Sequence, residues 1–366
     1  MRVNAAANKT ADQNADRTAD VLIIGDGVIG LSTALELARA GASCSVIGQR
    51  RPGIASLAAA GLLAPSIGHL HDEVRPFFFG SLELYPAFVD LLREFEPSLA
   101  LVRGLIDVTP PDPARPRDIP PRLTAAEVGM LEPAVVASAG ATYHPSNGAI
   151  DNVALVRALR RALDARPNID VVGDDPAVSV TFSEREPVVV LESGARHAAP
   201  VIVLAAGAWS PQLQGLPRPI PISPLKGQML ALRSTVLGRT VMGSDVYLVP
   251  RSTELVVGAT VERAGFDVET DRAALDVLRA AAISIVPDLA DAPIVRSWAG
   301  IRPATPDMLP IIGFEPTEPR LIYACGHSKN GILLAPATAV AAAALAQNLR
   351  SELSVAPFSI SRFSAA

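Results

Sequence analysis

The sequence predicts an α/β fold, α+β overall, with a parallel sheet near its amino-terminal end. The apolar run Val21–Ile24 is typical of a strand buried on both faces. The stretch GDGVIG, residues 25–30, follows directly, and apolar residues then recur at helical spacing over residues 28–38. Residues 42–47 form another apolar segment, which predicts the next strand. Strand, glycine-rich turn, helix and strand in this order are typical of a Rossmann-like dinucleotide-binding unit.

Each glycine of this motif has a physical role in binding a dinucleotide. Gly25 permits the tight turn, Gly27 lets the backbone approach a pyrophosphate, and Gly30 lets the helix pack on the strand. The helix N-terminus, with Val28 and Ile29, brings partial positive charge to the phosphates. The alternative is a glycine-rich turn that binds no ligand, and the strand–helix–strand context disfavours it.

The acidic residue that usually binds the ribose, about 20 positions after the motif, is absent. The stretch GQRR, residues 48–51, stands at the end of the second predicted strand. Two interpretations remain open at this point. Gln49 takes the ribose hydroxyl contact as a neutral substitute, or Arg50 and Arg51 hold the 2′-phosphate of NADP.

Composition and charge narrow the class of protein. The chain has 366 residues, 49% of them apolar, which suffices for two domains with ordinary cores. A net charge of -5 argues against a nucleic-acid partner, because binding phosphates needs clustered Lys and Arg. The longest apolar run, residues 335–345, is shorter than the ~20 residues that a membrane span needs. Residues 1–18 lack the apolar block of a secretion signal, so we expect a disordered tail and a cytoplasmic protein.

Cysteine and histidine usage indicates neither disulfides nor a metal. Cys44 and Cys325 lie in predicted strands far apart in the sequence, so we expect reduced, buried thiols. His69 and His71 have no cysteine or carboxylate partners at ligand spacing, so no metal site is predicted. The proline-rich segment 110–121 is expected to be a solvated loop.

Several further motifs give the chain a family resemblance. The sequence resembles the D-amino acid oxidase superfamily of flavoproteins, and within it the glycine oxidase branch. The motifs occur in the family's order from about residue 20 to residue 350. They are GDGVIG, AAAGLLAP (58–65), LAAGAWS (204–210), PLKGQ (224–228), YLVPR (247–251), VVGATVERAGFD (256–267), WAGIRPAT (298–305) and GHSKNGILLAPAT (326–338).

This resemblance implies non-covalently bound FAD and two domains. A discontinuous Rossmann-like FAD-binding domain would comprise residues 19–80, 145–215 and 306–366. A substrate domain on a large mixed β-sheet would comprise residues 81–144 and 216–305. Beyond the glycine motif, the implied cofactor-binding positions are Gln49, Ala60, Gly61, Leu62, Ala206, Gly207, Trp209, Arg302, His327, Ser328, Lys329, Asn330, Gly331 and Ile332.

The resemblance implies two residues that act on the substrate, and the sequence pattern adds Asp245 beside them. The resemblance assigns the substrate carboxylate to Arg302, whose planar guanidinium can donate two parallel hydrogen bonds, and places the phenol of Tyr247 nearby. Alternating residues 244–250 predict a strand, with Asp245 and Tyr247 on one face. An ionised Asp245 beside the site would attract a cationic substrate.

Lysine is rare in this chain, since 29 of the 32 basic residues are arginines. Lys329 nevertheless stands where the glycine oxidase pattern usually has arginine. We hypothesise that it is functional, as a second substrate contact or as a charge near the flavin; the alternative is a solvated loop lysine. Lys226 is interpreted as bracing the sheet, and His327 as a structural or flavin-edge residue without a partner that would make it a base.

The implied reaction is two-electron oxidation of glycine or a similar small amino acid to the imine, with O2 reduced to H2O2. Lys329 and Asp245 motivate an alternative, in which the enzyme oxidises a glycyl or amino group on a larger cationic metabolite, as in tailoring of aminoglycoside-type antibiotics. An NADP-dependent reductase and a flavin-binding protein without turnover are lesser alternatives. The partners expected are the amine and O2, and the family suggests a homo-oligomer.

Overall fold

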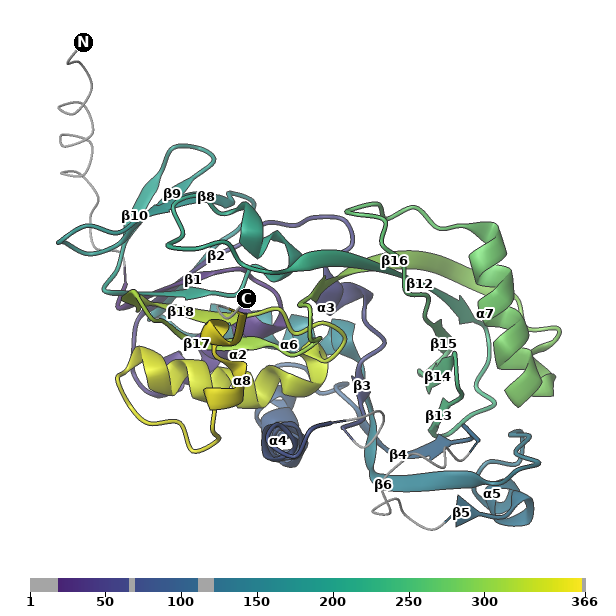
Figure 1. Cartoon of the computed structure of the whole chain (residues 1–366). Coiled ribbons are helices and arrows are strands. Elements are labelled where there is room, and N and C mark those ends of the chain that lie inside the picture. The colour runs from purple at the N-terminus through teal and green to yellow at the C-terminus, as the bar shows by residue number, and fades with distance from the viewer. Residues whose placement is uncertain (1–18, 66–69, 111–121, 364–366) are drawn as a thin grey trace.

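The glycine motif lies at the end of a central strand in a six-stranded sheet of the computed structural model (Figure 1). The structure describes residues 19–65, 70–110 and 122–363. The tail predicted at residues 1–18 lies outside the described residues, as does most of the loop predicted at residues 110–121.

Among the described residues, the sheet runs in the order β17-β18-β11-β1-β2-β7, and all neighbours except β17 and β18 are parallel. Strand β1 pairs in register with β11 on one side and β2 on the other, so these three strands end at one level. The strands are β1 (Val21–Ile24), β2 (Cys44–Ile47), β7 (Ile169–Val172), β11 (Val201–Leu204), β17 (Ile311–Glu315) and β18 (Glu318–Cys325).

Helices cover one face of this sheet and a small sheet covers the other (Figure 1). Ile23 and Val46 pack against the helices, whereas Leu22 and Ile202 face the small sheet. This layering confirms the predicted α/β class. The helices are α2 (Val28–Arg39), α4 (Arg75–Arg93), α6 (Asn152–Asp164) and α8 (Gly331–Ala346), and the small sheet comprises β8 (Ala177–Thr181), β9 (Val188–Leu191) and β10 (Arg196–Ala198).

A large mixed sheet of nine strands forms the other part of the molecule, on the right in Figure 1. Its outer face packs on the helices α5 (Ala125–Leu131) and α7 (Arg272–Ile285). Strand β5 pairs with β6 at one side of the sheet. In spatial order the others are β16 (Ile294–Ala304), β12 (Ser223–Leu232), β15 (Leu255–Gly258), β14 (Tyr247–Pro250), β13 (Thr240–Met242), β4 (Leu101–Asp107), β6 (Ala141–Ile150) and β3 (Leu62–Leu63), and β5 is Arg122–Leu123.

Short helical segments complete the described elements. They are α3 (Ala55–Ala58) and four 3-10 segments, namely η2 (Gly207–Gln212), η3 (Pro287–Leu289), η4 (Ala356–Phe358) and η5 (Ile360–Phe363). Between residues 19 and 363, outside the two undescribed gaps, no helix is both long and apolar enough to cross a membrane.

The elements relate to the predicted domains in a simple way. All six strands of the first sheet come from the three segments assigned to FAD binding. Residues 81–93, assigned to the substrate domain, lie in α4, which packs with α8 beside the first sheet. Strand β6 crosses the expected boundary at residue 145. The domain boundaries remain a prediction.

The strand predicted over residues 244–250 is shorter than expected, because it begins only at Tyr247. Residues 243–246 form the turn that joins β13 to β14, and the N–H of Gly243 donates to the carbonyl of Val246 over 2.7 Å. Gly, Ser and Asp favour turns. The alternation of residue types over 244–250 therefore includes part of a hairpin turn and is not a strand throughout. Asp245 is exposed in this turn and does not share a strand face with Tyr247.

Both cysteines are buried and free, as predicted. Cys44 lies on β2 and Cys325 on β18. Burial, as the main cause, raises the pKa of each thiol to about 12. Both groups are therefore neutral at physiological pH.

Side chains of helix α4 donate hydrogen bonds to two backbone carbonyls in the first turns of α8. Pro336 lies inside α8 and has no N–H to donate to the carbonyl of Ile332. The phenol of Tyr85 donates to that carbonyl instead, and the hydroxyl of Ser81 donates to the carbonyl of Leu333 over 2.7 Å. Tyr85 and Ser81 are fully buried. These hydrogen bonds hold the first turns of α8, which begins at the last residue of GHSKNG.

Tyr85→Phe is expected to lower the free energy of unfolding by about 1–3 kcal/mol, because it leaves the buried carbonyl of Ile332 unpaired. Pro336→Ala supplies an N–H at the right position, so the same substitution should cost less in that background. Chemical denaturation of the wild type, both single variants and the double variant measures the difference. An equal Tyr85→Phe penalty in both backgrounds would contradict this interpretation.

Candidate functional site

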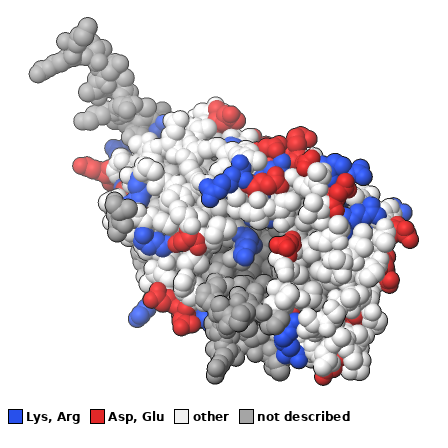
Figure 2. Space-filling view, turned by 45° about the vertical axis from the view of Figure 1, so that its right-hand side comes forward, with Lys and Arg blue, Asp and Glu red and all other residues white. Residues whose placement is uncertain are grey.

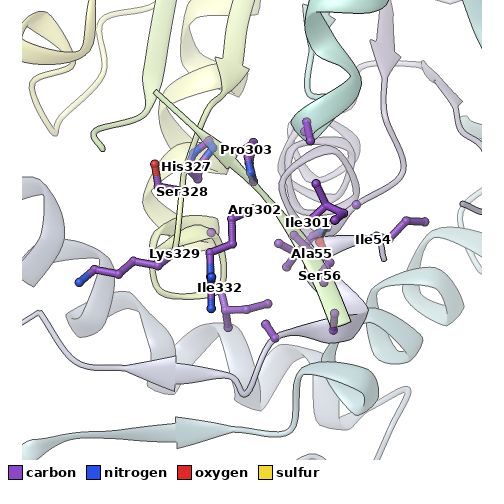
Figure 3. Close-up of a pocket in the computed structure, with 18 of the residues that line it drawn as sticks. Ile54, Ala55, Ser56, Ile301, Arg302, Pro303, His327, Ser328, Lys329 and Ile332 are labelled. Atoms are coloured by element: carbon purple, nitrogen blue, oxygen red, sulfur yellow. Dashed lines mark hydrogen bonds between the residues drawn. The ribbon is translucent and has the colours of Figure 1, made fainter. Parts of the chain in front are cut away.

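A cavity of about 590 Å³ is lined by residues from both large sheets. The ends of β1, β2, β11 and β18 contribute to it from the first sheet, and β12, β14 and β16 from the second. Figure 3 shows the part of the cavity where Arg302 on β16 approaches the segment that leads into α8. The nucleotide motif and two of the predicted substrate residues, Arg302 and Tyr247, therefore face one continuous space.

The glycine motif forms a close-packed cradle at one end of the cavity. Gly25 has φ +117°, and a Cβ there would lie 2.3 Å from the carbonyl oxygen of Ala205 at the end of β11. A Cβ on Gly30 would lie 1.8 Å from the carbonyl oxygen of Gly25. Helix α2 begins at Val28, whose N–H donates to the hydroxyl of Ser56 over 2.9 Å. Only glycine fits these two positions, and the helix N-terminus faces the cavity.

All of the predicted cofactor-binding residues except Gly30 line this cavity. Gly30 instead provides the close helix–strand contact, which is the role that the motif predicts for it. The sequence did not single out several polar residues of the lining, among them Asp26 and Ser56. Asp26 lies within the motif itself, but only the structure shows where its side chain points. The binding roles of these residues remain predictions.

Arg302 is held by backbone carbonyls and has no carboxylate partner. Its Nη1 donates to the carbonyl of Thr260 over 3.0 Å and to that of Lys226 over 3.4 Å. The guanidinium lies against Gly227 on β12, where a Cβ would be 2.3 Å from Nη2. Among the described residues, Arg302 forms no ion pair. A fixed, uncompensated guanidinium that lines a cavity is suited to an anionic ligand.

Tyr247 presents a neutral phenol to the same cavity. Its hydroxyl lies 3.4 Å from the sulfur of Met229, and a Cβ on Gly258 would lie 2.6 Å from that hydroxyl. Burial raises the pKa of Tyr247, and the positive charge of Arg302 offsets part of this shift. The phenol therefore stays protonated at neutral pH and can donate a hydrogen bond.

The two lysines of the predicted motifs have different surroundings. Lys226 is buried and forms an ion pair with Asp267, which lowers the pKa of that carboxyl group. Lys329 lines the cavity and is exposed, and it forms no ion pair with any described residue. In Figure 3 its side chain extends away from Arg302. Lys226 thus fits the predicted structural role, whereas Lys329 offers a free charge at the cavity.

The cavity lining bears on two alternatives drawn from the sequence. Asp245, expected beside Tyr247, does not line the cavity, so it supplies no negative charge for a cationic substrate. Arg50, expected to bind a 2′-phosphate, is exposed and also lies outside the lining. Arg51 does line the cavity, but its Nε donates to the side-chain oxygen of Gln49, and its guanidinium lies 5.4 Å from the ring centre of Trp209.

His327 is a buried, neutral residue in the loop before α8. Its Nε2 lies 3.0 Å from the hydroxyl of Thr338. Burial lowers the pKa of His327 to about 3. A histidine that stays neutral and already hydrogen bonded fits the structural role predicted for it.

The charges of the described surface are mixed in sign. On the face seen in Figure 2, basic and acidic side chains are interspersed among uncharged residues. Within the described ranges, no group of three or more His, Cys, Asp or Glu side chains could hold a metal ion. Of the two histidines weighed as ligands, His71 is exposed and His69 lies outside those ranges.

Comparisons with known proteins identify the family of the chain. A family model described as "DAO: FAD dependent oxidoreductase" matches residues 20–345. The chain belongs to this family. The resemblance predicted from the motifs is therefore confirmed, and FAD is the family's cofactor. The cradle fits it, because the close-packed glycines and the N-terminus of α2 leave room for a pyrophosphate where the cavity begins.

The chain is also similar in sequence and structure to individual proteins. It is 33% identical over 374 residues to a bifunctional protein ThiO/ThiG of Trichormus variabilis, covering 94% of this chain and 55% of that protein. The chain thus spans about half the length of this relative. The crystal structure of glycine oxidase from Geobacillus kaustophilus superposes with a TM-score of 0.86 at 31% identity, covering 95% and 99% of the two chains. Iminodiacetate oxidase from Chelativorans sp. BNC1 superposes with a TM-score of 0.83 at 27% identity, covering 93% and 98%.

The buried state of His327 predicts a measurable pH dependence of stability. The folded protein keeps His327 neutral down to about pH 3, whereas the unfolded chain takes up a proton near pH 6.5. Between these values the unfolded state binds more protons, so the contribution of His327 to stability is lost as the pH falls. His327→Gln should reduce the slope of unfolding free energy against pH by roughly one proton. Chemical denaturation between pH 4.5 and 6.5 tests this, and equal slopes for both proteins would contradict it.

Proposed function

We propose that this protein oxidises the carbon–nitrogen bond of glycine, or of a similarly small amino acid, to the imine and reduces O2 to H2O2. One observation carries the proposal: a guanidinium fixed by backbone carbonyls, without a carboxylate partner among the described residues, lines the same cavity as the FAD cradle. The similarity to glycine oxidase supports the choice of substrate.

Arg302 and Tyr247 would bind the substrate carboxylate. The guanidinium donates hydrogen bonds to both oxygens of a carboxylate, and the neutral phenol donates one more. Because the backbone carbonyls of Thr260 and Lys226 already hold Arg302, little side-chain entropy is lost on binding. This arrangement would fix the adjoining carbon and amine within the cavity.

The positive charge of Arg302 also favours the neutral form of the bound amine, because a nearby cation disfavours an ammonium. A neutral amine needs no protein base, and its N–H proton passes to solvent as the imine forms. His327 is not required as a base, since its Nε2 is hydrogen bonded to Thr338. FAD, which Gly25, Gly27 and the N-terminus of α2 would hold, would supply the hydride acceptor and the means of transferring two electrons to O2, giving H2O2.

The direct test is to measure O2 uptake and H2O2 formation by the FAD-loaded protein with glycine, sarcosine and D-alanine. Equal amounts of O2 consumed and H2O2 formed with at least one of these substrates would support the proposal. Turnover that consumes no O2, or the absence of turnover with every small amino acid offered, would rule it out.

Arg302→Lys is expected to lower kcat/KM for the amino acid roughly a hundredfold, because lysine keeps the charge but loses the planar fork and its fixed position. Arg296→Lys is a matched control on the same strand, since Arg296 is paired with Glu254 and does not line the cavity. It should leave kcat/KM within about twofold of the wild type. Similar losses in the two variants would show that Arg302 is not the carboxylate contact.

A second substrate class, amines that carry two carboxylates, is favoured by Lys329. This residue is exposed, lines the cavity and has no ion-pair partner among the described residues. The Lys329 side chain extends away from Arg302, but its four-carbon stem is flexible, so we infer that it turns to meet the distal carboxylate of a substrate such as iminodiacetate while Arg302 holds the first. The similarity to an iminodiacetate oxidase supports this inference. The larger cationic metabolite is less well supported, because Asp245 does not line the cavity.

Lys329→Ala should lower kcat/KM for iminodiacetate about two- to fivefold, the size expected for an exposed charge pair, and leave glycine almost unaffected. Lys329→Arg keeps the charge and should preserve most of the activity with iminodiacetate. Steady-state kinetics with both substrates measures the difference. Equal changes for glycine and iminodiacetate would remove the proposed contact.

A further inference from the structure

The position at which a ribose-binding acid is expected has no side chain, and a neighbouring carboxylate fills its space. Gly48 follows the last residue of β2. A Cβ built on Gly48 would lie 2.2 Å from Cγ of Asp26 and 2.6 Å from its Oδ1. Residue 48 therefore cannot carry a side chain while Asp26 keeps this conformation. The carboxyl group of Asp26 lies where an acidic side chain at residue 48 would begin.

Strand pairing explains how the two positions come to share one space. Strands β1 and β2 are parallel with Ile24 opposite Ile47, and the N–H of Gly25 donates to the carbonyl of Ile47 over 2.7 Å. Asp26 and Gly48 therefore follow neighbouring strand ends at the same level of the sheet. A side chain from either position reaches the same part of the cavity.

Among the described residues, one oxygen of the Asp26 carboxylate accepts a hydrogen bond and the other does not. Its Oδ2 accepts a hydrogen bond from Nη2 of Arg160 on α6 over 2.5 Å, and the side chain of Asp26 is nearly buried. Its Oδ1 accepts no hydrogen bond from the described residues, and Asp26 lines the cavity. One oxygen is thus fixed by Arg160, while the other is available to a ligand. Arg160 also compensates the negative charge close to the expected pyrophosphate.

We propose that Asp26 supplies the carboxylate that binds the adenosine ribose of FAD, in place of the acid absent from the end of β2. In Rossmann-like units, an acid at this strand end accepts a hydrogen bond from the ribose 2′-hydroxyl. Asp26 offers the same chemistry from the neighbouring strand end. The neutral substitute considered above, Gln49, has its side-chain oxygen engaged by Arg51. A carboxylate at this place also disfavours a 2′-phosphate, and hence NADP.

The test measures how tightly the full-length chain, stripped of its flavin, binds FAD and an FAD analogue with 2′-deoxyadenosine. Binding is followed by the change in flavin fluorescence. The wild type is expected to bind the analogue roughly ten- to a hundredfold more weakly, the range for a hydrogen bond to a charged group. Asp26→Asn keeps a neutral acceptor oxygen in place of the charged one, so its preference for FAD over the analogue should shrink and its FAD affinity should fall. Equal wild-type affinities for the two nucleotides would overturn the proposal, whether or not any variant folds.

Two further variants separate ligand binding from a structural role of the ion pair. Arg160→Gln removes the partner but keeps the carboxylate, so it should retain the preference for FAD over the 2′-deoxy analogue. The exchange Asp26→Gly with Gly48→Glu returns the acid to the end of β2, and should bind FAD more tightly than Asp26→Gly alone. Loss of the hydroxyl preference in Arg160→Gln to the same extent as in Asp26→Asn would overturn the proposal. So would an exchange variant that binds FAD no better than Asp26→Gly.

Discussion

The site depends on the parallel pairing of β1 with β11 and β2 in one register. Because the three strands end at the same level, the loops that follow them converge on one place. The close approach of these loops leaves no room for side chains at Gly25 and Gly30. The glycine motif is thus required by the packing of neighbouring strand ends as much as by the cofactor. A bulky residue at either position would displace β11 or α2 and disturb the cradle.

Positive charges around the cavity differ in how they are compensated. Lys226 is buried and paired with Asp267, and Arg160 is paired with Asp26. Arg302 is held by backbone carbonyls, which orient a guanidinium without neutralising it. Lys329 is exposed and has no ion-pair partner among the described residues. Three positive charges that line the cavity have no ion-pair partner among the described residues: Arg302, Lys329 and Arg51, and Arg51 contacts Gln49 and Trp209. This distribution gives a physical reason to expect a carboxylate next to the flavin.

Much of this site could be predicted from the sequence, because its signals are local. The strand, glycine motif and helix at residues 21–39 have distinct periodicities, and the motifs around Arg302 and Lys329 carry a family resemblance over most of the chain. Features that depend on side-chain direction could not be predicted. The alternation at residues 244–250 concealed a hairpin turn, so Asp245 was wrongly placed on a strand face. Lys329 lines the cavity and its functional role stays a prediction, and nothing in the sequence showed that it extends away from Arg302.

The residue that takes the place of the missing ribose-binding acid could not be predicted from the sequence either. Counting about 20 positions on from the glycine motif leads to residue 48. Because residue 48 is glycine, the sequence does not show which side chain replaces the acid. The space that this glycine leaves is filled from β1, and only the register of β1 with β2 reveals that Asp26 takes it. A contact between the ends of neighbouring strands is invisible to a motif that is read along one segment.

The central claim is that one cavity holds FAD and binds a small amino acid beside it. Anaerobic addition of glycine to the purified, FAD-loaded protein tests it most directly, with the visible absorbance of the flavin as the signal. In the wild type, glycine is expected to bleach this absorbance, which should return when O2 is admitted. A flavin that remains oxidised with glycine, sarcosine and iminodiacetate alike would contradict it.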